Sequence, residues 1–273
     1  DNFDKGLNVI SNIFGPEIPV FCSYDNEKPS SISNIIFKEF KGKHPAGLVG
    51  TQVHFTLPVS FKRQVWTIGY QEVIAIGHLF TNGNIKLDKY VSLGGEGVYE
   101  PKILKTNVGA SIDQLTAGKI KDNTRVIAGS VLNGIHAKDV MSFVGAFDNQ
   151  ISVLPDEAND ILFNWAMPGS KLHSQMGAFL SSWIKPKKFI FNTSINGGNR
   201  AIVPLPPYEE VMPLNILATQ LLKALVTKDI ELGVKLGVLE LAPEDLALSS
   251  YVCPSKYDYQ TILQENLDLI FEE

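Results

Sequence analysis

Cysteine, long apolar runs and runs of one charge are all scarce in this 273-residue sequence. Its two cysteines, Cys22 and Cys253, are too few for a disulfide framework, which favours a reducing, cytoplasmic compartment. No apolar run approaches the ~18 residues that a membrane-spanning helix needs, so we predict a soluble or peripheral protein. The net charge of −5 comes without a long run of like charges, which argues against a nucleic-acid or anionic-membrane surface.

The sequence also begins without an initiating methionine or a signal peptide, at Asp1. We therefore expect it to be part of a longer protein whose N-terminal part is missing. A hydrophobic content of 44% is ample for a globular core. The length alone suggests two domains, since one domain typically has ~100–200 residues.

Several common site motifs are absent. The glycines of His44–Thr51 (H-P-A-G-L-V-G-T) are not followed by a Lys-Ser/Thr pair and do not form G-x-G-x-x-G, so phosphate binding is disfavoured. His44 and His54 lack a third ligand at a recognisable spacing and are interpreted as loop or packed histidines rather than metal ligands. Gly95-x-Gly97 is interpreted as a hairpin turn, because no helix follows that could bind a phosphate.

The stretch between Pro155 and Pro207 contains reactive side chains but no nucleophile-and-base spacing. They are Trp165, His173, Trp183 and the basic group Lys185-Pro186-Lys187-Lys188. The lysines are interpreted as a solvated loop, with an acidic partner surface as the alternative. We predict no catalytic residue and no metal site in this chain.

Residues 1–83 are predicted to form part of a Rossmann-like α/β domain. Apolar residues at Leu7, Ile10 and Ile13 indicate a first helix. The remaining predicted elements are the strands Ile18–Phe21 and Gln64–Ile68 and the helix Gln71–Phe80, ended by Thr81-Asn82-Gly83.

Residues 84–207 are predicted to form a β-grasp, or ubiquitin-like, domain followed by a β/loop segment. The predicted elements are the strands Leu87–Leu93, Lys102–Thr106 and Arg125–Ala128, with a short helix Ile112–Thr116 capped by Ser111. Asn196–Asn199 is a turn signal that predicts a hairpin of the strands Lys188–Thr193 and Ala201–Val203.

Residues 208–273 are predicted to form a C-terminal helical bundle, so the fold class is α/β plus α. Leucines and alanines from Leu214 to Leu225 recur at helical spacing after Pro213. Further helices are predicted over Asp229–Leu236, from Pro243, and from Tyr259 to Ile270.

One spacing in this helical segment is typical of an iron–sulfur protein. A bacterial ferredoxin loop reads C-x2-C-x2-C-x3-C-P. Counted back from Cys253 and Pro254, the other three cysteine positions fall on Pro243, Leu246 and Ser249. One thiolate does not hold a cluster that needs about four, so we predict a degenerate site. The alternative is a lone buried cysteine before a proline that ends a turn.

The ordered motifs of the chain resemble one family. The segments Leu246–Tyr259, His44–Thr51 and Val211–Leu217 closely resemble the A subunit of the sodium-translocating NADH:quinone oxidoreductases, and the likeness runs through nearly the whole chain in order. This resemblance implies kinship with the C subunit of Rnf-type complexes and with the NADH- and flavin-binding subunit of respiratory complex I. In those relatives the helical segment carries an iron–sulfur cluster.

The resemblance implies a subunit that has lost its cofactors. The residues at Pro243, Leu246 and Ser249 agree with that picture, and the loop His44–Thr51 lacks the acidic residue of the relatives' flavin loop, which argues against flavin binding. The whole enzyme passes electrons from NADH to ubiquinone and moves sodium outward. The implied partners are ubiquinone and the other subunits, especially the membrane-embedded ones, at the cytoplasmic face of the bacterial inner membrane.

Three functions remain open on these grounds. The first is a cofactor-free peripheral subunit that shapes a quinone pocket or docks the membrane subunits. The apolar faces of Val73–Leu79 and Leu214–Leu225 are candidate contact surfaces, but core packing is the favoured interpretation of each. The alternatives are an active flavin- or NAD-binding oxidoreductase domain and a pure assembly scaffold.

Overall fold

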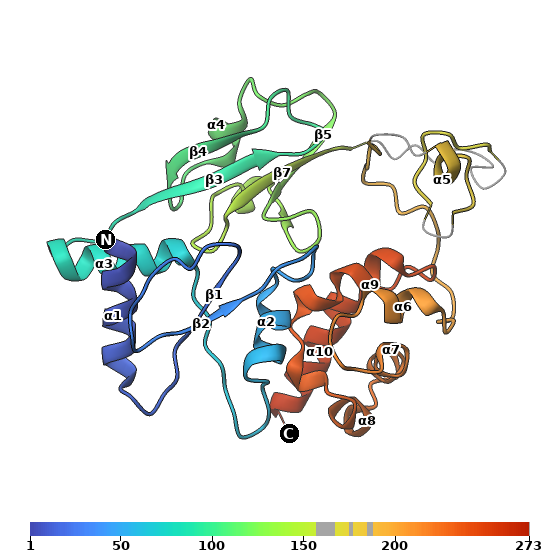
Figure 1. The fold of residues 1–273 in the computed structure, drawn as a ribbon. Helices are drawn as coiled ribbons and strands as arrows, with labels where there is room; N and C mark the ends of the chain where they lie inside the picture. The colour runs from blue at the N-terminus through green and yellow to red at the C-terminus, as the bar shows by residue number, and fades with distance from the viewer. Residues whose placement is uncertain (157–166, 175–176, 185–187, 273) are drawn as a thin grey trace. The chain divides into compact units, whose positions relative to one another are not determined.

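The computed structural model describes residues 1–156, 167–174, 177–184 and 188–272. A two-stranded parallel sheet and a five-stranded mixed sheet are combined with several helices, so the fold is of the α/β plus α class (Figure 1). The chain divides into two compact units. Unit 1 contains Asp1–Leu87, Ile202–Cys253 and Tyr257–Glu273, and unit 2 contains Asp88–Ala201 and Pro254–Lys256. The domain bounds 1–83, 84–207 and 208–273 stay predictions.

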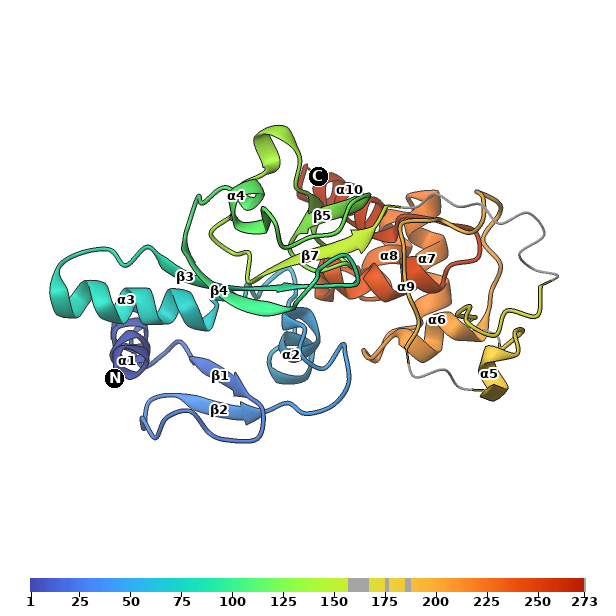
Figure 2. The ribbon, with the colours of Figure 1, turned by 90° about the horizontal axis from the view of Figure 1, so that it is seen from above.

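Two crossed helices begin unit 1. The helices α1 (Asn2–Phe14) and α3 (Tyr70–Asn82) cross closely (Figure 1, Figure 2). Leu7 of α1 and Val73 of α3 are buried in one small core together with Ile35, as expected for apolar helix faces, but Ile13 is 67% exposed. Gly83 ends α3 in the left-handed conformation (φ 74°), which glycine adopts at little cost. The predicted helix Gln71–Phe80 is thereby confirmed.

The strand pair of unit 1 is parallel. Strand β1 (Phe21–Tyr24) pairs with β2 (Ile36–Glu39), and α2 (Val49–Thr56) follows. The predicted strand Ile18–Phe21 is wrong in position, because pairing with β2 starts only at Phe21 and Ile18 is 54% exposed. The predicted strand Gln64–Ile68 is also wrong: these residues follow a tight turn and form no regular element, and Trp66 is 88% exposed.

The helices of unit 1 after residue 205 share one apolar core. They are α6 (Pro206–Val211), α7 (Ala218–Thr227), α8 (Ile230–Lys235), η3 (Val238–Glu240), η4 (Pro243–Leu246), α9 (Ala247–Val252) and α10 (Tyr259–Glu272). Leu221, Leu222 and Leu225 are at most 1% exposed, so this predicted face is a core face. The helices predicted over Asp229–Leu236, from Pro243 and from Tyr259 are confirmed.

The helix predicted directly after Pro213 instead begins at Ala218. The Glu209 carboxylate of α6 accepts hydrogen bonds from the amide nitrogens of Ala218 (3.3 Å) and Thr219 (2.9 Å). These are among the first amide groups of α7, which have no partner inside the helix. A carboxylate from another helix therefore fixes where α7 starts.

Unit 2 is built on a five-stranded mixed sheet of order β4-β3-β7-β5-β6. Its strands are β3 (Asp88–Gly94), β4 (Lys102–Asn107), β5 (Thr124–Ala128), β6 (Ile135–His136) and β7 (Gln150–Pro155), and α4 (Ile112–Thr116) lies between β4 and β5 in the sequence. The predicted strands, the hairpin turn at Gly95 and the Ser111 cap are confirmed. Alternate residues such as Val91, Leu93 and Ile151 face the core.

The last part of unit 2 departs from the prediction. The short helix η1 (Asp139–Met141) precedes β7 and α5 (Ser181–Ile184) follows it, but the described residues 188–205 include no strand. The predicted hairpin of Lys188–Thr193 and Ala201–Val203 is therefore wrong. Ile190 is 73% exposed, so its apolar pattern has no buried face to pair against.

Candidate functional sites

The four degenerate cluster positions lie on η4, on α9 and just after it. Leu246, Ser249 and Cys253 are at most 1% exposed, and Pro243 is half-buried. The structure therefore places three of them inside the helical core of unit 1. Pro243 and Leu246 carry no ligand atom, and the Ser249 hydroxyl has no hydrogen-bond partner within the described part of the chain.

Two phenol groups enclose the remaining thiol. The Tyr208 hydroxyl lies 3.2 Å from Cys253 Sγ, the Tyr259 hydroxyl lies 3.6 Å from it, and the two hydroxyls are 3.3 Å apart. Burial, which is the largest cause, raises the pKa of Tyr208 to about 12 and raises that of Tyr259 as well. Both phenols stay protonated at neutral pH. Sequence reasoning missed both, because they lie outside the cysteine spacing.

This environment does not fit an iron–sulfur cluster. A cluster needs about four thiolate ligands and space for the inorganic core. Here one thiol is surrounded by Tyr208, Tyr259 and the side chains of a packed apolar core. The thiol and the two hydroxyls can hydrogen-bond to one another as neutral groups, but they do not provide a set of ligands for iron.

His54 is a packed residue that joins α2 to the helical core. Its Nδ1 lies 2.6 Å from the Glu240 carboxylate, and the amide of Asn215 donates to its Nε2 (3.3 Å). Because Nε2 accepts a hydrogen bond, Nδ1 carries the proton and donates to Glu240. Over the described residues, no group of three or more His, Cys, Asp or Glu side chains is arranged to hold a metal ion. His44 is exposed in the turn before α2.

The loop Gly42–Gly47 borders a hollow of about 270 Å³ at the carboxyl ends of β1 and β2. We call it the strand-end hollow. Its lining also includes Ser23, Tyr24, Asp25, Phe40 and Gln52, and Gln52 Nε2 donates to the Ala46 carbonyl (3.3 Å). Ligands of open α/β sheets bind at this end of parallel strands. The sequence indicated the glycine-containing loop but not β2.

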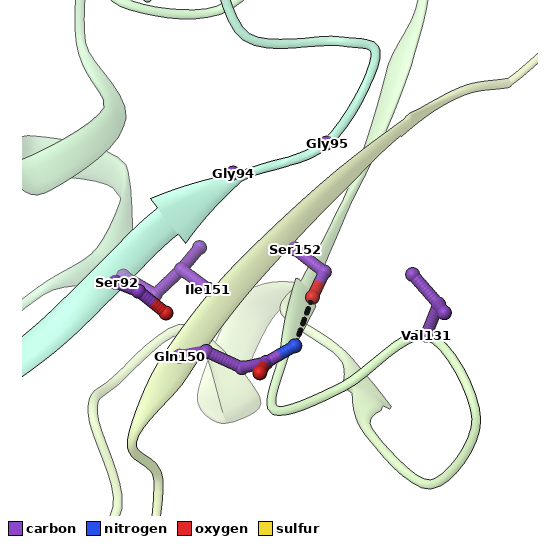
Figure 3. Close-up of a pocket in the computed structure, with 7 residues that line it drawn as sticks. All are labelled: Ser92, Gly94, Gly95, Val131, Gln150, Ile151 and Ser152. Carbon is purple, nitrogen blue, oxygen red and sulfur yellow. Dashed lines mark hydrogen bonds between the residues drawn. The ribbon is translucent and has the colours of Figure 1, made fainter. Parts of the chain in front are cut away.

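A second hollow, of about 330 Å³, lies on the sheet of unit 2 (Figure 3). We call it the sheet hollow. Its lining residues are Ser92, Gly94 and Gly95 from the end of β3, Gln150, Ile151 and Ser152 from β7, and Val131 from the loop after β5. No lining side chain is charged. The sequence indicated only the turn at Gly95, because β3 and β7 are brought together only by the sheet.

The other residues singled out from the sequence do not converge. Trp66 and Trp183 are 88% and 85% exposed, and the His173 ring packs 5.2 Å from that of Phe189. Trp165 and Lys185–Lys187 lie outside the described residues. Within the described ranges, no helix is long and apolar enough to cross a membrane.

Two family models, both of NqrA domains, match the first part of the chain. The model described as the NqrA second alpha/beta domain matches residues 1–85, and the one described as the NQRA C-terminal domain matches residues 90–139.

Curated relatives are similar to this chain over almost its full length. The A subunit of the Na(+)-translocating NADH-quinone reductase of Psychromonas ingrahamii is 46% identical over 99% of this chain. The subunits of the same name from Teredinibacter turnerae and Neisseria gonorrhoeae are each 45% identical over 100% of it. The chain spans 61%, 61% and 62% of these three relatives. The chain therefore carries NqrA domain matches and is similar over its full length to part of the A subunits of Na(+)-translocating NADH-quinone reductases.

Proposed function

We propose that this chain serves as a cofactor-free part of a peripheral subunit in a sodium-pumping NADH:ubiquinone oxidoreductase. It would contribute to quinone binding, to docking of the membrane-embedded subunits, or to both, at the cytoplasmic face of the bacterial inner membrane. The relatives' names support the complex. The packing of Cys253 between Tyr208 and Tyr259 is the observation that carries the cofactor-free role.

The chemistry of the side chains supports a non-catalytic role for this chain. Hydride transfer and electron conduction need a flavin, a nicotinamide or a metal cluster. Pro243, Leu246 and Ser249 offer no thiolate, and the loop His44–Thr51 offers no carboxylate. We assign no catalytic residue to it.

Finer fold assignments belong to the same proposal. The parallel β1–β2 pair with α1, α2 and α3 supports a partial Rossmann-like domain. The mixed sheet with α4 between β4 and β5 supports a β-grasp domain. The helices from α6 to α10 support a ferredoxin-type helical domain without its cluster.

A tryptophan-quenching titration tests the quinone role. Short-chain ubiquinone is titrated into the chain, with a redox-inert analogue of equal hydrophobicity as control. Trp66 and Trp183 are exposed, so collisions alone give a non-saturating slope. Saturable quenching by the quinone only is expected. Equal, non-saturating quenching by both compounds would remove quinone binding from this chain and leave docking.

A flavin- or NAD-binding domain is the second candidate function. The strand-end hollow favours it, because it lies at the carboxyl ends of parallel strands and includes Asp25, an acidic group of the kind that binds a ribose hydroxyl. Flavin absorbance in the purified chain, with flavin released by acid, would support this candidate and overturn the cofactor-free proposal.

An assembly scaffold without quinone affinity is the third candidate. Phe61, Trp66 and Tyr70 are 71%, 88% and 59% exposed within one short segment. Clustered exposed apolar side chains of this kind are typical of protein contacts. Capture of the membrane subunits by this chain, measured with and without quinone, separates the candidates. The scaffold is supported if the amount captured does not depend on quinone and the chain binds no quinone.

A further inference from the structure

The sheet hollow has a polar floor made by two strands that run in parallel. Ser92 of β3 is paired in register with Gln150 of β7, and Gly94 with Ser152. Side chains alternate across a strand, so these four residues share one face while Leu93 and Ile151 point into the core. Gly94 and Gly95 lie at the end of β3, across from Val131 (Figure 3).

The hydrogen bonds of this floor fix its polar groups. Gln150 Nε2 donates to Ser152 Oγ (2.9 Å), and Ser152 Oγ donates to the Gly129 carbonyl (2.7 Å). Ser152 is only 5% exposed. An amide nitrogen carries two hydrogens, so Gln150 has a second N–H for a ligand. Ser92 is exposed and adds a second hydroxyl to this floor.

These groups match an uncharged ligand that carries carbonyl oxygens. The lining has no cation for a phosphate or carboxylate and no carboxylate for an amine. The amide and hydroxyl donate to carbonyl acceptors, and Val131, which is 53% exposed, supplies an apolar wall. The strand-end hollow differs, because Asp25 places a negative charge beside any ligand there.

We propose that the sheet hollow binds the headgroup of a quinone, with Gln150 and Ser92 donating to its carbonyl oxygens. This inference rests on the proposed function, and it locates the quinone site within the chain. A quinone headgroup is uncharged, planar and accepts hydrogen bonds without donating them. Gln150 and Ser92 act here as binding residues.

Three glycines allow a matched steric test. An added Cβ meets no atom within 4 Å at Gly94, at Gly47 or at Gly198, and none of the three has a positive φ. A valine at Gly94 would project into the sheet hollow, and a valine at Gly47 would line the strand-end hollow. Gly198 lines neither and serves as the control. All three variants should fold.

The test is equilibrium dialysis of the 273-residue chain with short-chain ubiquinone. Gly94→Val is expected to weaken binding at least about tenfold by filling the site. Gly47→Val and Gly198→Val are expected to bind as the parent does. Gln150→Met keeps the side-chain length and removes the donor, so a loss of about fivefold is expected. Thermal unfolding of each variant verifies its fold.

The outcomes separate this site from the proposed function. If the parent binds quinone saturably and Gly94→Val binds it equally well, the sheet hollow is not the quinone site. The quinone role then belongs elsewhere in the chain. If only Gly47→Val loses quinone binding, the quinone binds in the strand-end hollow, and the sheet-hollow proposal is again overturned. A similar loss in all three variants also overturns it, because the effect is not local. No saturable binding by the parent overturns the sheet hollow as a quinone site and reduces the proposed function to docking.

Discussion

At the scale of single residues, Cys253 is defined by the groups that surround it. It is fully buried, and its thiol and the hydroxyls of Tyr208 and Tyr259 contact one another in a closed triangle. Free cysteine suits such a site, because it behaves as a small hydrophobe with weak hydrogen bonding. The residue therefore has a packing role that does not depend on iron.

Replacing Cys253 by alanine should lower the stability of the protein only slightly. The two tyrosines keep their mutual hydrogen bond, so we expect Cys253→Ala to lower the free energy of unfolding by about 1 kcal/mol. Urea unfolding measures this, with Cys22→Ala as the control at a half-exposed cysteine. In the proposed complex, quinone reduction should persist. A well-folded Cys253→Ala variant that loses it would contradict the packing role.

Asp245 is a buried carboxylate with one satisfied oxygen. Its Oδ2 accepts from the Ala242 amide (2.8 Å), while Oδ1 has no hydrogen-bond partner among the described residues. Its carboxylate lies against Gly50, where any added Cβ would overlap it. Burial raises the pKa of Asp245 above its ordinary value of 3.8, and burial also raises that of Glu244.

The raised pKa of Asp245 gives stability a defined pH dependence. The folded state binds the proton more tightly than the unfolded state, so this contribution to stability is fully present below the ordinary pKa and is lost as pH rises through the folded pKa. Asp245→Asn keeps an oxygen acceptor for Ala242 and removes the charge. Its free energy of unfolding should therefore fall less than that of the parent as pH rises from about 4. Urea unfolding at a series of pH values measures the two slopes, and equal slopes would refute the assignment.

Residue-scale contacts of this kind were largely beyond sequence reasoning. The His54–Glu240 contact joins residues 186 positions apart, and the Glu209 cap of α7 depends on where α6 packs. The Cys253 spacing was visible, but its tyrosine neighbours come from other helices. Local spacing indicates which chemistry a residue offers, and the fold decides which groups meet.

At the scale of elements, two glycines let α1 and α3 cross at close range. A Cβ at Gly6 would overlap the Val73 carbonyl, and one at Gly77 would overlap the Asn2 carbonyl. Backbone atoms cannot move aside as a flexible side chain can. The contact between these helices therefore depends on the absence of a side chain at both positions.

This close crossing predicts an unusual effect of alanine in a helix. Replacing glycine by alanine in a helix with free space beside it raises the free energy of unfolding by about 1 kcal/mol. Forcing an extra methyl group into a tight contact lowers it by about 1–3 kcal/mol. We expect the steric cost to win at Gly77, so Gly77→Ala should lower the melting temperature. Gly233→Ala in α8 is the matched control, because its nearest atom is 3.8 Å away, and it should be neutral or stabilising. A stabilised Gly77→Ala variant would rule out the tight crossing.

The elements themselves were predictable where local signals are strong. The helix ending at Gly83, the β3–β4 hairpin, the Ser111 cap and the helix with its N-cap at Asp229 all follow from turn, capping and periodicity rules. The predicted strands that failed, over 18–21, 64–68, 188–193 and 201–203, are short apolar stretches. Such stretches become strands only beside a partner, and partners are set by long-range pairing.

At the scale of the whole molecule, unit 1 is discontinuous in sequence. Residues 88–201 lie between its first segment, Asp1–Leu87, and the helical segment that begins at Ile202. The contacts that complete α2, from Glu240 to His54 and from Asp245 to Gly50, come from the later segment.

This arrangement sets an order of events during synthesis on the ribosome. Unit 2 emerges as a nearly continuous stretch with its own core, and it can fold while translation proceeds. The surface of α2 stays uncovered until its contact residues Glu240 and Asp245 have left the exit tunnel. Slow decoding or premature termination between residues 201 and 240 would thus leave nascent chains with most of unit 2 and an exposed α2, the state in which a chaperone would meet them.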